Sequence, residues 1–507
     1  MTQRRRGRPE FRHPALFLRP CKGTRGFIPF PLMKTFFKSA SALLVNKFCR
    51  TLSRGTMPLG LLLSPFMGGI GVAAETPFYL KNGDRVCFYG DSITEQRYYG
   101  MDVAAYVRTR FPDLHVKFVN SGVGGDRVSG GWAGGIDERL QRDVFPFQPD
   151  VVTIMLGMND AGYRPFDPQV FGAYTNGYEH IILSLQQQLP GVRIVLIEPT
   201  PYDDVTFPPN FPGGYNAVLQ RYAAFVRQLA VAHHLMCVDF MTPLLDVIQK
   251  AQAQDPLVAQ EVIPGRVHPS ALGELLMAQA LLKAWNAPAV VTSVTIDAAH
   301  DMVVQADSST VTDVGTAAQT ISWTQKDQSL PFPILGLHES WWQFPPTEMD
   351  GGSLTFFTPA PQPKWDYTDA ASEKIVRLSG FYSALDQERL KVQGLTAGNY
   401  ELKINGKPVG KFDADQLEAG INLAEYDTPM LEQAYQVLDL EWKQVAWRFF
   451  AWRGIQTQLT FDRDVAVQKA ADSLIAALYA QKDQIEDQQH VASQPQPTHY
   501  ELVSLTE

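Results

Sequence analysis

The feature that most constrains the fold is an alternation of short apolar runs and longer helical stretches between residues 84 and 286. The apolar runs are RVCFYG, HVKFVN, VVTIML, RIVLIEP and LMCVDF, and the stretches between them include YEHIILSLQQQL, whose apolar residues lie three or four apart. This alternation predicts an α/β fold, with a parallel sheet covered by helices on both faces. Because ligands bind beyond the carboxyl ends of the strands in such sheets, the segments that follow the strands are the candidate sites.

The pattern changes after residue 290. SVTIDAAHDMVVQA and RLKVQGLTAGNYELKINGKPVGKF alternate apolar and polar residues, and Asn405-Gly406 is a strong hairpin signal. Residues 429–452 and 464–486 have helical spacing. Since 507 residues exceed what one hydrophobic core usually organises, we expect an α/β domain over 75–288. A mainly β accessory domain with a helical segment should follow over 291–462, and a C-terminal helix with a flexible tail over 463–507.

The first 74 residues have the pattern of a leader. Basic residues over 34–54 precede MPLGLLLSPFMGGIGVAA, which ends in small residues. We expect cleavage near Ala74 and export to the periplasm or the outside of the cell. Because the basic part is long, Met33 or Met57 is an alternative start of translation. A membrane anchor is the competing interpretation, but the apolar stretch is short and broken by prolines and glycines, so we expect no stable anchor.

Charge and cysteine content exclude several classes of function. The net charge is -9, and the one dense basic cluster, residues 4–8, lies in the leader, so we expect no nucleic-acid partner. After cleavage only Cys87 and Cys237 remain, both in apolar runs. Two cysteines make no disulfide framework, and no Cys/His cluster has the spacing of a structural zinc site. We therefore expect free buried thiols and no metal. Nothing in the sequence indicates the oligomeric state.

Two polar side chains follow apolar runs at strand exits. Ser92 follows the first run in FYGDSITEQ, and Asn159 follows the third in MLGMNDAGY. A serine becomes a nucleophile when a base takes its proton, and an asparagine amide can donate to an oxygen that becomes negative in the transition state. The alternative at each position is an ordinary turn, which Gly, Asp, Ser and Asn all favour.

Two further segments complete the candidate chemistry. NSGVGGDRVSGG follows the second run, and its glycines could let a backbone N–H point at a substrate oxygen. Neither phosphate-loop pattern fits it, which argues against nucleotide binding. His268, in IPGRVHPSALGELL, is the one of ten histidines in the loop between the last run and the closing helix. A structural role is the alternative for this histidine.

The four segments GDSIT, GVGGD, GMND and VHP, in this order, resemble the four sequence blocks of the SGNH (GDSL-type) hydrolases. The resemblance spans residues 84–286 and implies a three-layer, flavodoxin-like α/β/α sandwich. It also implies ester hydrolysis by an activated serine, without metal or cofactor. By position, Ser92 would be the nucleophile and His268 the general base. The N–H groups of Ser92 and Gly125 and the side chain of Asn159 would form the oxyanion hole.

One position departs from the family pattern. The family usually has an aspartate three residues before the histidine, but here that residue is Gly265. A backbone carbonyl such as that of Gly265 could accept the histidine N–H instead, as in family members with a Ser-His dyad. Glu261, Asp255 or a carboxylate of the second domain are alternatives. Loss of the carboxylate partner can lower turnover strongly in other serine hydrolases, so reduced activity is one expectation.

The expected function is a secreted serine ester hydrolase that removes short acyl groups, such as acetyl, from carbohydrate or small esters through an acyl-enzyme. The loop YDDVTFPPNFPGGYN is short and polar, and no long apolar lid helix is evident in the α/β domain. A lysophospholipase-like lipid esterase is the alternative within the same chemistry. A non-catalytic carbohydrate-binding protein on the hydrolase scaffold is the alternative from another class.

Aromatic residues cluster in the second half of the chain. They could stack on sugars, although packing within the protein is the favoured interpretation. The clusters are Trp341, Trp342 and Phe344, then Trp365 and Tyr367, and finally Trp442, Trp447 and Trp452.

Overall fold

A computed structural model of the protein describes residues 77–317, 319–334, 349–350, 353–354, 370–460 and 462–505. By its internal contacts the chain divides into residues 1–73 and 74–507, and the described residues all belong to the second unit. The leader and the predicted cleavage site near Ala74 lie outside the described residues. So do the aromatic clusters at 341–344 and 365–367.

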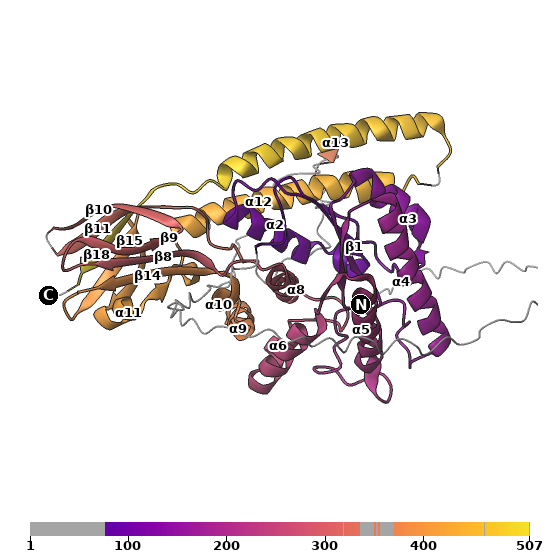
Figure 1. Ribbon diagram of the computed structural model, residues 1–507, viewed down its shortest axis with the longest axis horizontal. Helices are drawn as coiled ribbons and strands as arrows, with labels where there is room; N and C mark the ends of the chain where they lie inside the picture. Colours follow the sequence, from indigo (N-terminus) through magenta and orange to yellow (C-terminus); the bar gives the residue numbers. More distant parts are fainter. Residues whose placement is uncertain are drawn as a thin grey trace, which may run out of the picture. The chain divides into compact units, whose positions relative to one another are not determined.

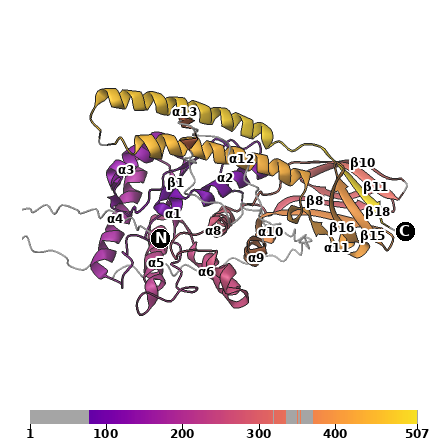
Figure 2. The same cartoon turned by 180° about the vertical axis from the view of Figure 1, so that it is seen from behind.

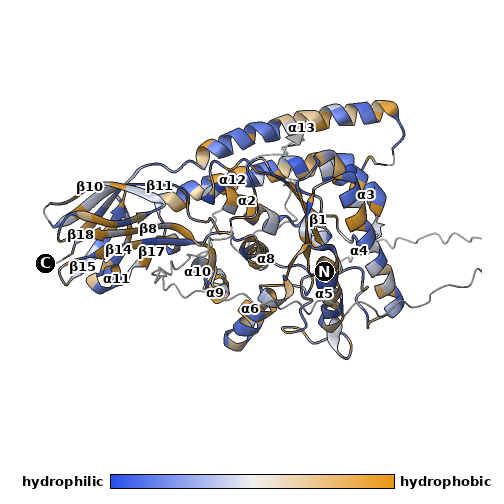
Figure 3. Ribbon diagram, viewed as in Figure 1, coloured by the Kyte–Doolittle hydropathy of each residue, from blue (hydrophilic) through white to orange (hydrophobic). Residues whose placement is uncertain are grey.

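A five-stranded parallel sheet forms the centre of the α/β part. Its three central strands, the second to fourth in the order below, are apolar and almost wholly buried because helices cover both faces, and Figure 3 shows β1 largely in the colour of hydrophobic residues. In spatial order they are β2 (Lys117–Asn120), β1 (Arg85–Gly90), β5 (Val151–Met155), β6 (Arg193–Ile197) and β7 (Met236–Val238). The chain order reverses direction at β1, so the edge beyond β1 and β5 is the expected ligand site.

Helices connect the parallel strands. Because such connections are right-handed, those that run to one side of β1 and those that run to the other side place their helices on opposite faces of the sheet. α2 and α8 pack together on one face, and α4 and α5 pack together on the other (Figures 1 and 2). The helices are α1 (Ser92–Glu95), α2 (Tyr98–Arg110), α3 (Ile136–Asp143), α4 (Pro168–Gln188), α5 (Gly214–His233), α6 (Met241–Gln254), α7 (Pro256–Gln260) and α8 (Ala271–Ala284), with a 3-10 turn η1 (Phe145–Phe147). A short hairpin, β3 (Gly130–Gly131) and β4 (Gly134–Gly135), precedes α3. The predicted three-layer α/β/α fold is confirmed.

The later part of the chain is mainly β, as predicted. One sheet has the order β17-β14-β8-β9 and the other β10-β11-β18-β15-β16. Side chains from both sheets and from the first half of α12 form one hydrophobic cluster. The strands are β8 (Val290–Asp297), β9 (Met302–Asp307), β10 (Ser309–Ala317), β11 (Thr320–Asp327), β14 (Gln387–Gln393), β15 (Asn399–Ile404), β16 (Lys407–Asp413), β17 (Ile421–Asn422) and β18 (Thr498–Ser504).

Shorter elements connect these sheets. They are the strand pair β12 (Met349–Asp350) and β13 (Ser353–Leu354), the helices α9 (Ala370–Ser379), α10 (Phe381–Leu385) and α11 (Ala414–Ala419), and a 3-10 turn η3 (Leu423–Glu425). Asn405 and Gly406 both have positive φ between β15 and β16, as the predicted hairpin requires.

The flexible tail expected at the end of 463–507 is wrong for residues 498–504. These residues form β18, which pairs with β11 on one side and β15 on the other. Tyr500 and Leu502 are fully buried, and the Tyr500 ring stacks on Trp323 with 5.0 Å between centroids. The alternation in HYELVSL is a strand signal, which the polar QHVASQPQPT stretch before it obscured.

The C-terminal helices pack on the α/β part. α12 (Pro429–Phe449) continues into a π-helix, η4 (Phe450–Gln456), and α13 (Val465–Ala492) lies beside α12 (Figures 1 and 2). Arg108 Nε of α2 is 3.0 Å from Glu441 Oε2, and Trp442 stacks on Tyr98. The helices predicted over 429–452 and 464–486 are therefore present, and Trp442 packs against the α/β part as favoured.

Candidate active site

The end of β1 positions Ser92. Gly90 is the last residue of β1, Asp91 caps α1 by accepting a hydrogen bond from the Ile93 N–H at 3.0 Å, and Ser92 is the first residue of that helix. A Cβ added at Gly90 would lie 2.8 Å from the Met155 carbonyl oxygen, so only glycine fits there. The tight exit leaves Ser92 half-buried at the carboxyl edge of the sheet.

His268 lies next to Ser92 although 176 residues separate them in sequence. Its Nε2 is 2.8 Å from Ser92 Oγ, which is hydrogen-bond distance. The adjoining loop is held from both sides: Gln96 Nε2 donates to the Pro269 carbonyl at 3.0 Å, and Ser270 caps α8. The nucleophile and base candidates thus meet in the geometry that proton transfer needs.

The loop after β2 brings Gly125 to the same edge. A Cβ added at neighbouring Gly124 would lie 3.9 Å from Ser92 Cβ, whereas one added at Gly125 would meet nothing within 4 Å. Gly125 has φ +78°, a conformation that favours glycine. Within the described part of the chain, the N–H groups of Ser92 and Gly125 donate no hydrogen bond. Both are therefore free to donate to a substrate oxygen.

Asn159 follows β5 and is nearly buried. Its Nδ2 donates to the Asp126 carbonyl at 3.1 Å and lies 3.4 Å from Asp91 Oδ2, while its Oδ1 accepts a hydrogen bond from Tyr163 Oη at 2.9 Å. These contacts fix the orientation of the amide beside the Gly125 loop, since Asp126 is the next residue. Tyr163 was not predicted, although MNDAGY places it four residues after the asparagine, on the same loop.

Buried carboxyl groups surround this asparagine. Burial raises the pKa of Asp91 to about 7 and that of Asp160 to about 7. Burial also raises the pKa of Asp126. Arg139 opposes this shift through an ion pair, with 2.7 Å between Arg139 Nε and Asp126 Oδ2. Near neutral pH the side chains of Asp91 and Asp160 are therefore only partly ionised, which limits the negative charge beside the candidate oxyanion hole.

The candidate partners for the His268 ring differ in position. Gly265 lies in the histidine loop with φ +83°. Glu261 is exposed, and Asp255 caps α7 and lies 3.8 Å from Lys374 Nζ. The role of either Gly265 or Glu261 as histidine partner stays a prediction.

Glu95 is a carboxylate that the sequence reasoning missed. Burial lowers the pKa of His268, and the charge of Glu95 is the contribution that opposes this. Glu95 Oε2 accepts a hydrogen bond from the Gly124 N–H at 2.7 Å. Its place in GDSITEQ, three residues after the serine, was the available signal.

An exposed tryptophan borders the site. Trp132 lies between β3 and β4 and is 51% exposed, and its Nε1 donates to the Gly124 carbonyl at 2.9 Å. The Arg453 guanidinium of η4 lies 4.3 Å from its ring centroid. The pattern GGWAGG, a tryptophan flanked by glycines, could have indicated an exposed ring.

Cysteine and histidine side chains outside the candidate site make contacts of their own. Cys87 and Cys237 are both free, as predicted; Cys87 is buried, but the prediction of burial is wrong for Cys237, which is half-buried on the edge strand β7. His180 and His233 pair with surface carboxylates of Asp137 and Glu179. In the described ranges, no three His, Cys, Asp and Glu side chains gather as a possible metal site.

The sequence of the α/β part matches a known family. Residues 88–276 match the GDSL-like Lipase/Acylhydrolase family. Residues 88–276 belong to the SGNH hydrolases. An acetylxylan esterase of Geobacillus stearothermophilus is 26% identical over 222 residues, which are 40% of this chain and 94% of that enzyme. The predictions of an SGNH domain and of an ester-bond hydrolase are confirmed.

Solved structures resemble the chain to different extents. A gut microbial diltiazem-metabolizing enzyme has a TM-score of 0.69 and 24% identity, over 85% of this chain and 100% of that one. A crystal structure of an acetylxylan esterase from Geobacillus stearothermophilus has a TM-score of 0.34 and 22% identity, over 41% of this chain and 96% of that one. The first likeness extends well beyond the SGNH domain, so the fold of the accessory part is shared as well. Among the described helices, none is both long and apolar enough to cross a membrane.

Proposed function

We propose that this SGNH hydrolase is an exported serine esterase that removes short acyl groups, such as acetyl, from carbohydrate or small esters through an acyl-enzyme. The observation that carries the proposal is the 2.8 Å distance between His268 Nε2 and Ser92 Oγ. A serine hydroxyl becomes nucleophilic when a base within hydrogen-bond reach accepts its proton.

In the first half of the reaction, Ser92 Oγ attacks the ester carbonyl carbon while its proton moves to His268 Nε2. The carbonyl oxygen becomes negative and would accept hydrogen bonds from the N–H groups of Ser92 and Gly125, and from Asn159 Nδ2 in place of its 3.4 Å hydrogen bond to Asp91 Oδ2. Each such donor contributes about a hundred- to a thousand-fold in rate. His268 then gives the proton to the leaving alcohol oxygen as the carbon–oxygen bond breaks, and an acyl-serine remains.

Water completes the cycle. His268 accepts a proton from a water molecule, whose oxygen attacks the acyl carbon, and the same three donors stabilise the second oxyanion. When the intermediate collapses, His268 returns the proton to Ser92 Oγ and the carboxylic acid leaves. Because burial lowers the pKa of His268, the imidazole is neutral, and able to accept a proton, at neutral pH.

The carbohydrate ester substrate is supported by two observations. The curated relative is named an acetylxylan esterase. In addition, the exposed Trp132 ring lies beside the loop that carries Gly125, and flat aromatic faces suit the apolar faces of sugar rings. The basic residues and apolar stretch that precede Ala74 support export.

The test uses purified residues 75–507 and p-nitrophenyl esters. The wild type should hydrolyse the acetyl ester faster than the octanoyl ester, and Ser92→Ala should abolish hydrolysis without lowering Tm. Acetylated xylan and a lysophospholipid are then compared as substrates. Faster release from the lysophospholipid would favour the lipid esterase, and equal inertness of wild type and Ser92→Ala with retained sugar binding would favour the non-catalytic scaffold.

A further inference from the structure

Four residues from separate segments form a closed ring of contacts beside the nucleophile. Arg453 Nε is 2.5 Å from Glu95 Oε1, and Glu95 Oε2 accepts the Gly124 N–H at 2.7 Å. The Gly124 carbonyl accepts the Trp132 Nε1–H at 2.9 Å, and the Trp132 ring lies under the Arg453 guanidinium. Glu95 is three residues after Ser92, and Gly124 directly precedes Gly125. The ring therefore joins the nucleophile segment to the loop of the candidate oxyanion hole.

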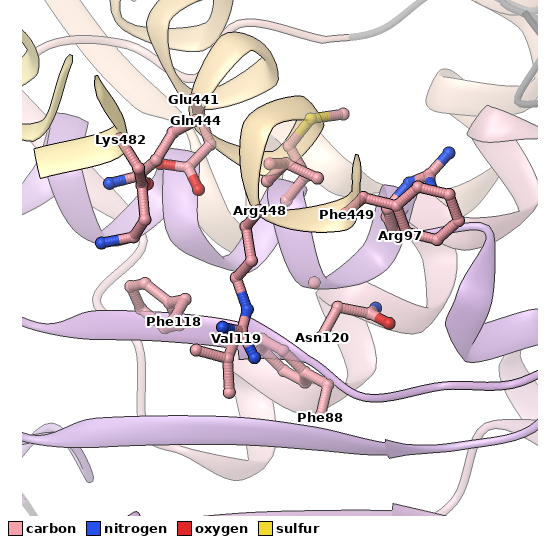
Figure 4. A pocket seen from close by; sticks show the side chains of 13 residues that line it. Phe88, Arg97, Phe118, Val119, Asn120, Glu441, Gln444, Arg448, Phe449 and Lys482 are labelled. Carbon is pink, nitrogen blue, oxygen red and sulfur yellow. The ribbon is translucent and has the colours of Figure 1, made fainter. Parts of the chain in front are cut away.

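Arg453 is the one member of this ring that lies outside residues 88–276. It belongs to η4, and the residues around it are fixed to the SGNH domain. Trp452 is buried against Val123, and its Nε1 donates to Asp143 Oδ1 at 2.7 Å. The Arg97 guanidinium lies 3.8 Å from the Phe449 ring centroid, and Figure 4 shows these two side chains together. A π-helical turn often occurs at functional sites, and here it directs Arg453 toward Glu95.

We propose that Arg453 is a positioning residue of the active site, supplied by the C-terminal helices, which holds Glu95 and through it the Gly124–Gly125 loop in the reactive geometry. The inference rests on the proposed roles of Ser92 and Gly125. On this proposal the SGNH domain is incomplete without the C-terminal helices. An error of about 1 Å in such a loop can lower the rate about a hundredfold.

The charges around Glu95 give the proposal a specific signature. Arg453 pairs with it directly, Arg97 and Asp91 interact with its charge, and Glu95 in turn raises the pKa of His268. Removing Arg453 leaves the Glu95 charge less compensated, so Glu95 opposes the burial effect more strongly and the pKa of His268 rises toward its ordinary value. Removing the Glu95 charge lowers it. The two substitutions should therefore shift the acid limb of the pH–rate profile in opposite directions.

The experiment compares Arg453→Gln, Arg453→Lys, Glu95→Gln and the double variant Glu95→Gln/Arg453→Gln in residues 75–507. Hydrolysis of p-nitrophenyl acetate and inactivation by a fluorophosphonate probe are measured against pH, with Tm as a folding check. Arg377→Gln is the matched control, because Arg377 pairs with Glu373 and Glu425 on the exposed surface.

We expect Arg453→Gln to lower kcat about ten- to a hundredfold with little change in KM and to move the acid limb to higher pH. Glu95→Gln should move it to lower pH, Arg453→Lys should retain the wild-type profile, and the control should match the wild type. Because Arg453→Gln and Glu95→Gln break the same ion pair, the double variant should lose no more activity than the less active of the two single variants.

A wild-type kcat and pH profile for Arg453→Gln, or additive losses in the double variant, would overturn the proposal. If Arg453→Gln does not fold, the proposal is overturned instead by a Glu95→Gln protein whose pH profile matches that of the wild type. Activity that survives Ser92→Ala refutes the proposed function instead, so the two failures are distinguishable.

Discussion

The substitution Gly122→Ala tests how closely the loop after β2 must approach α1. A Cβ added at Gly122 would lie 2.7 Å from the Thr94 carbonyl carbon and also close to the Glu95 backbone nitrogen. Since carbon atoms pack at about 3.5–4.0 Å, the loop and the helix must separate by about 1 Å. Both Ser92 and Gly125 depend on this contact, because each lies within three residues of it.

We expect Gly122→Ala to lower kcat on p-nitrophenyl acetate about a hundredfold, as a 1 Å displacement of reacting groups does. The overpacking should also cost about 1–3 kcal/mol in the free energy of unfolding. Gly172→Ala is the control: Gly172 lies in the second turn of α4, where its Cβ would meet nothing within 4 Å, so it should gain about 0.5–1 kcal/mol of stability with kcat unchanged. A folded Gly122→Ala protein with the kcat of the wild type would refute the reasoning.

Two further predictions concern pH and the exposed aromatic ring. Burial lowers the pKa of His268 below its ordinary value of about 6.5. We therefore expect kcat/KM to fall on the acid side only below about pH 6.5. A pH–rate profile with its acid midpoint at or above about pH 7 would contradict this. Trp132→Ala should raise KM for acetylated xylan about tenfold, a loss of ~1.4 kcal/mol, with KM for p-nitrophenyl acetate unchanged. Trp132→Phe, which keeps an aromatic face, should have a KM for acetylated xylan closer to that of the wild type. Equal changes in KM for both substrates would mean that the Trp132 ring only stabilises the loop and does not bind the sugar.

Much of the candidate site was predictable because its groups lie at strand exits. Ser92, Gly125 and Asn159 follow β1, β2 and β5 directly, and parallel strands deliver such residues to one edge of a sheet. His268 was predictable for a related reason, since it lies in the loop before the closing helix. Tyr163 and Trp132 were missed because nothing in the sequence around a single tyrosine or tryptophan in a loop identifies its hydrogen-bond partner.

The sequence by itself determined the layered α/β domain and its mainly β companion and indicated the candidate reacting groups, because periodicity and strand-exit motifs are local properties of the chain. Only the tertiary structure decided that residues 498–504 complete a sheet and that Arg453 reaches Glu95, 358 residues away. Such contacts depend on how α12 and η4 pack against α1 and the loop after β2. Packing between distant segments follows from the shape of the whole core, which no local pattern in the sequence encodes.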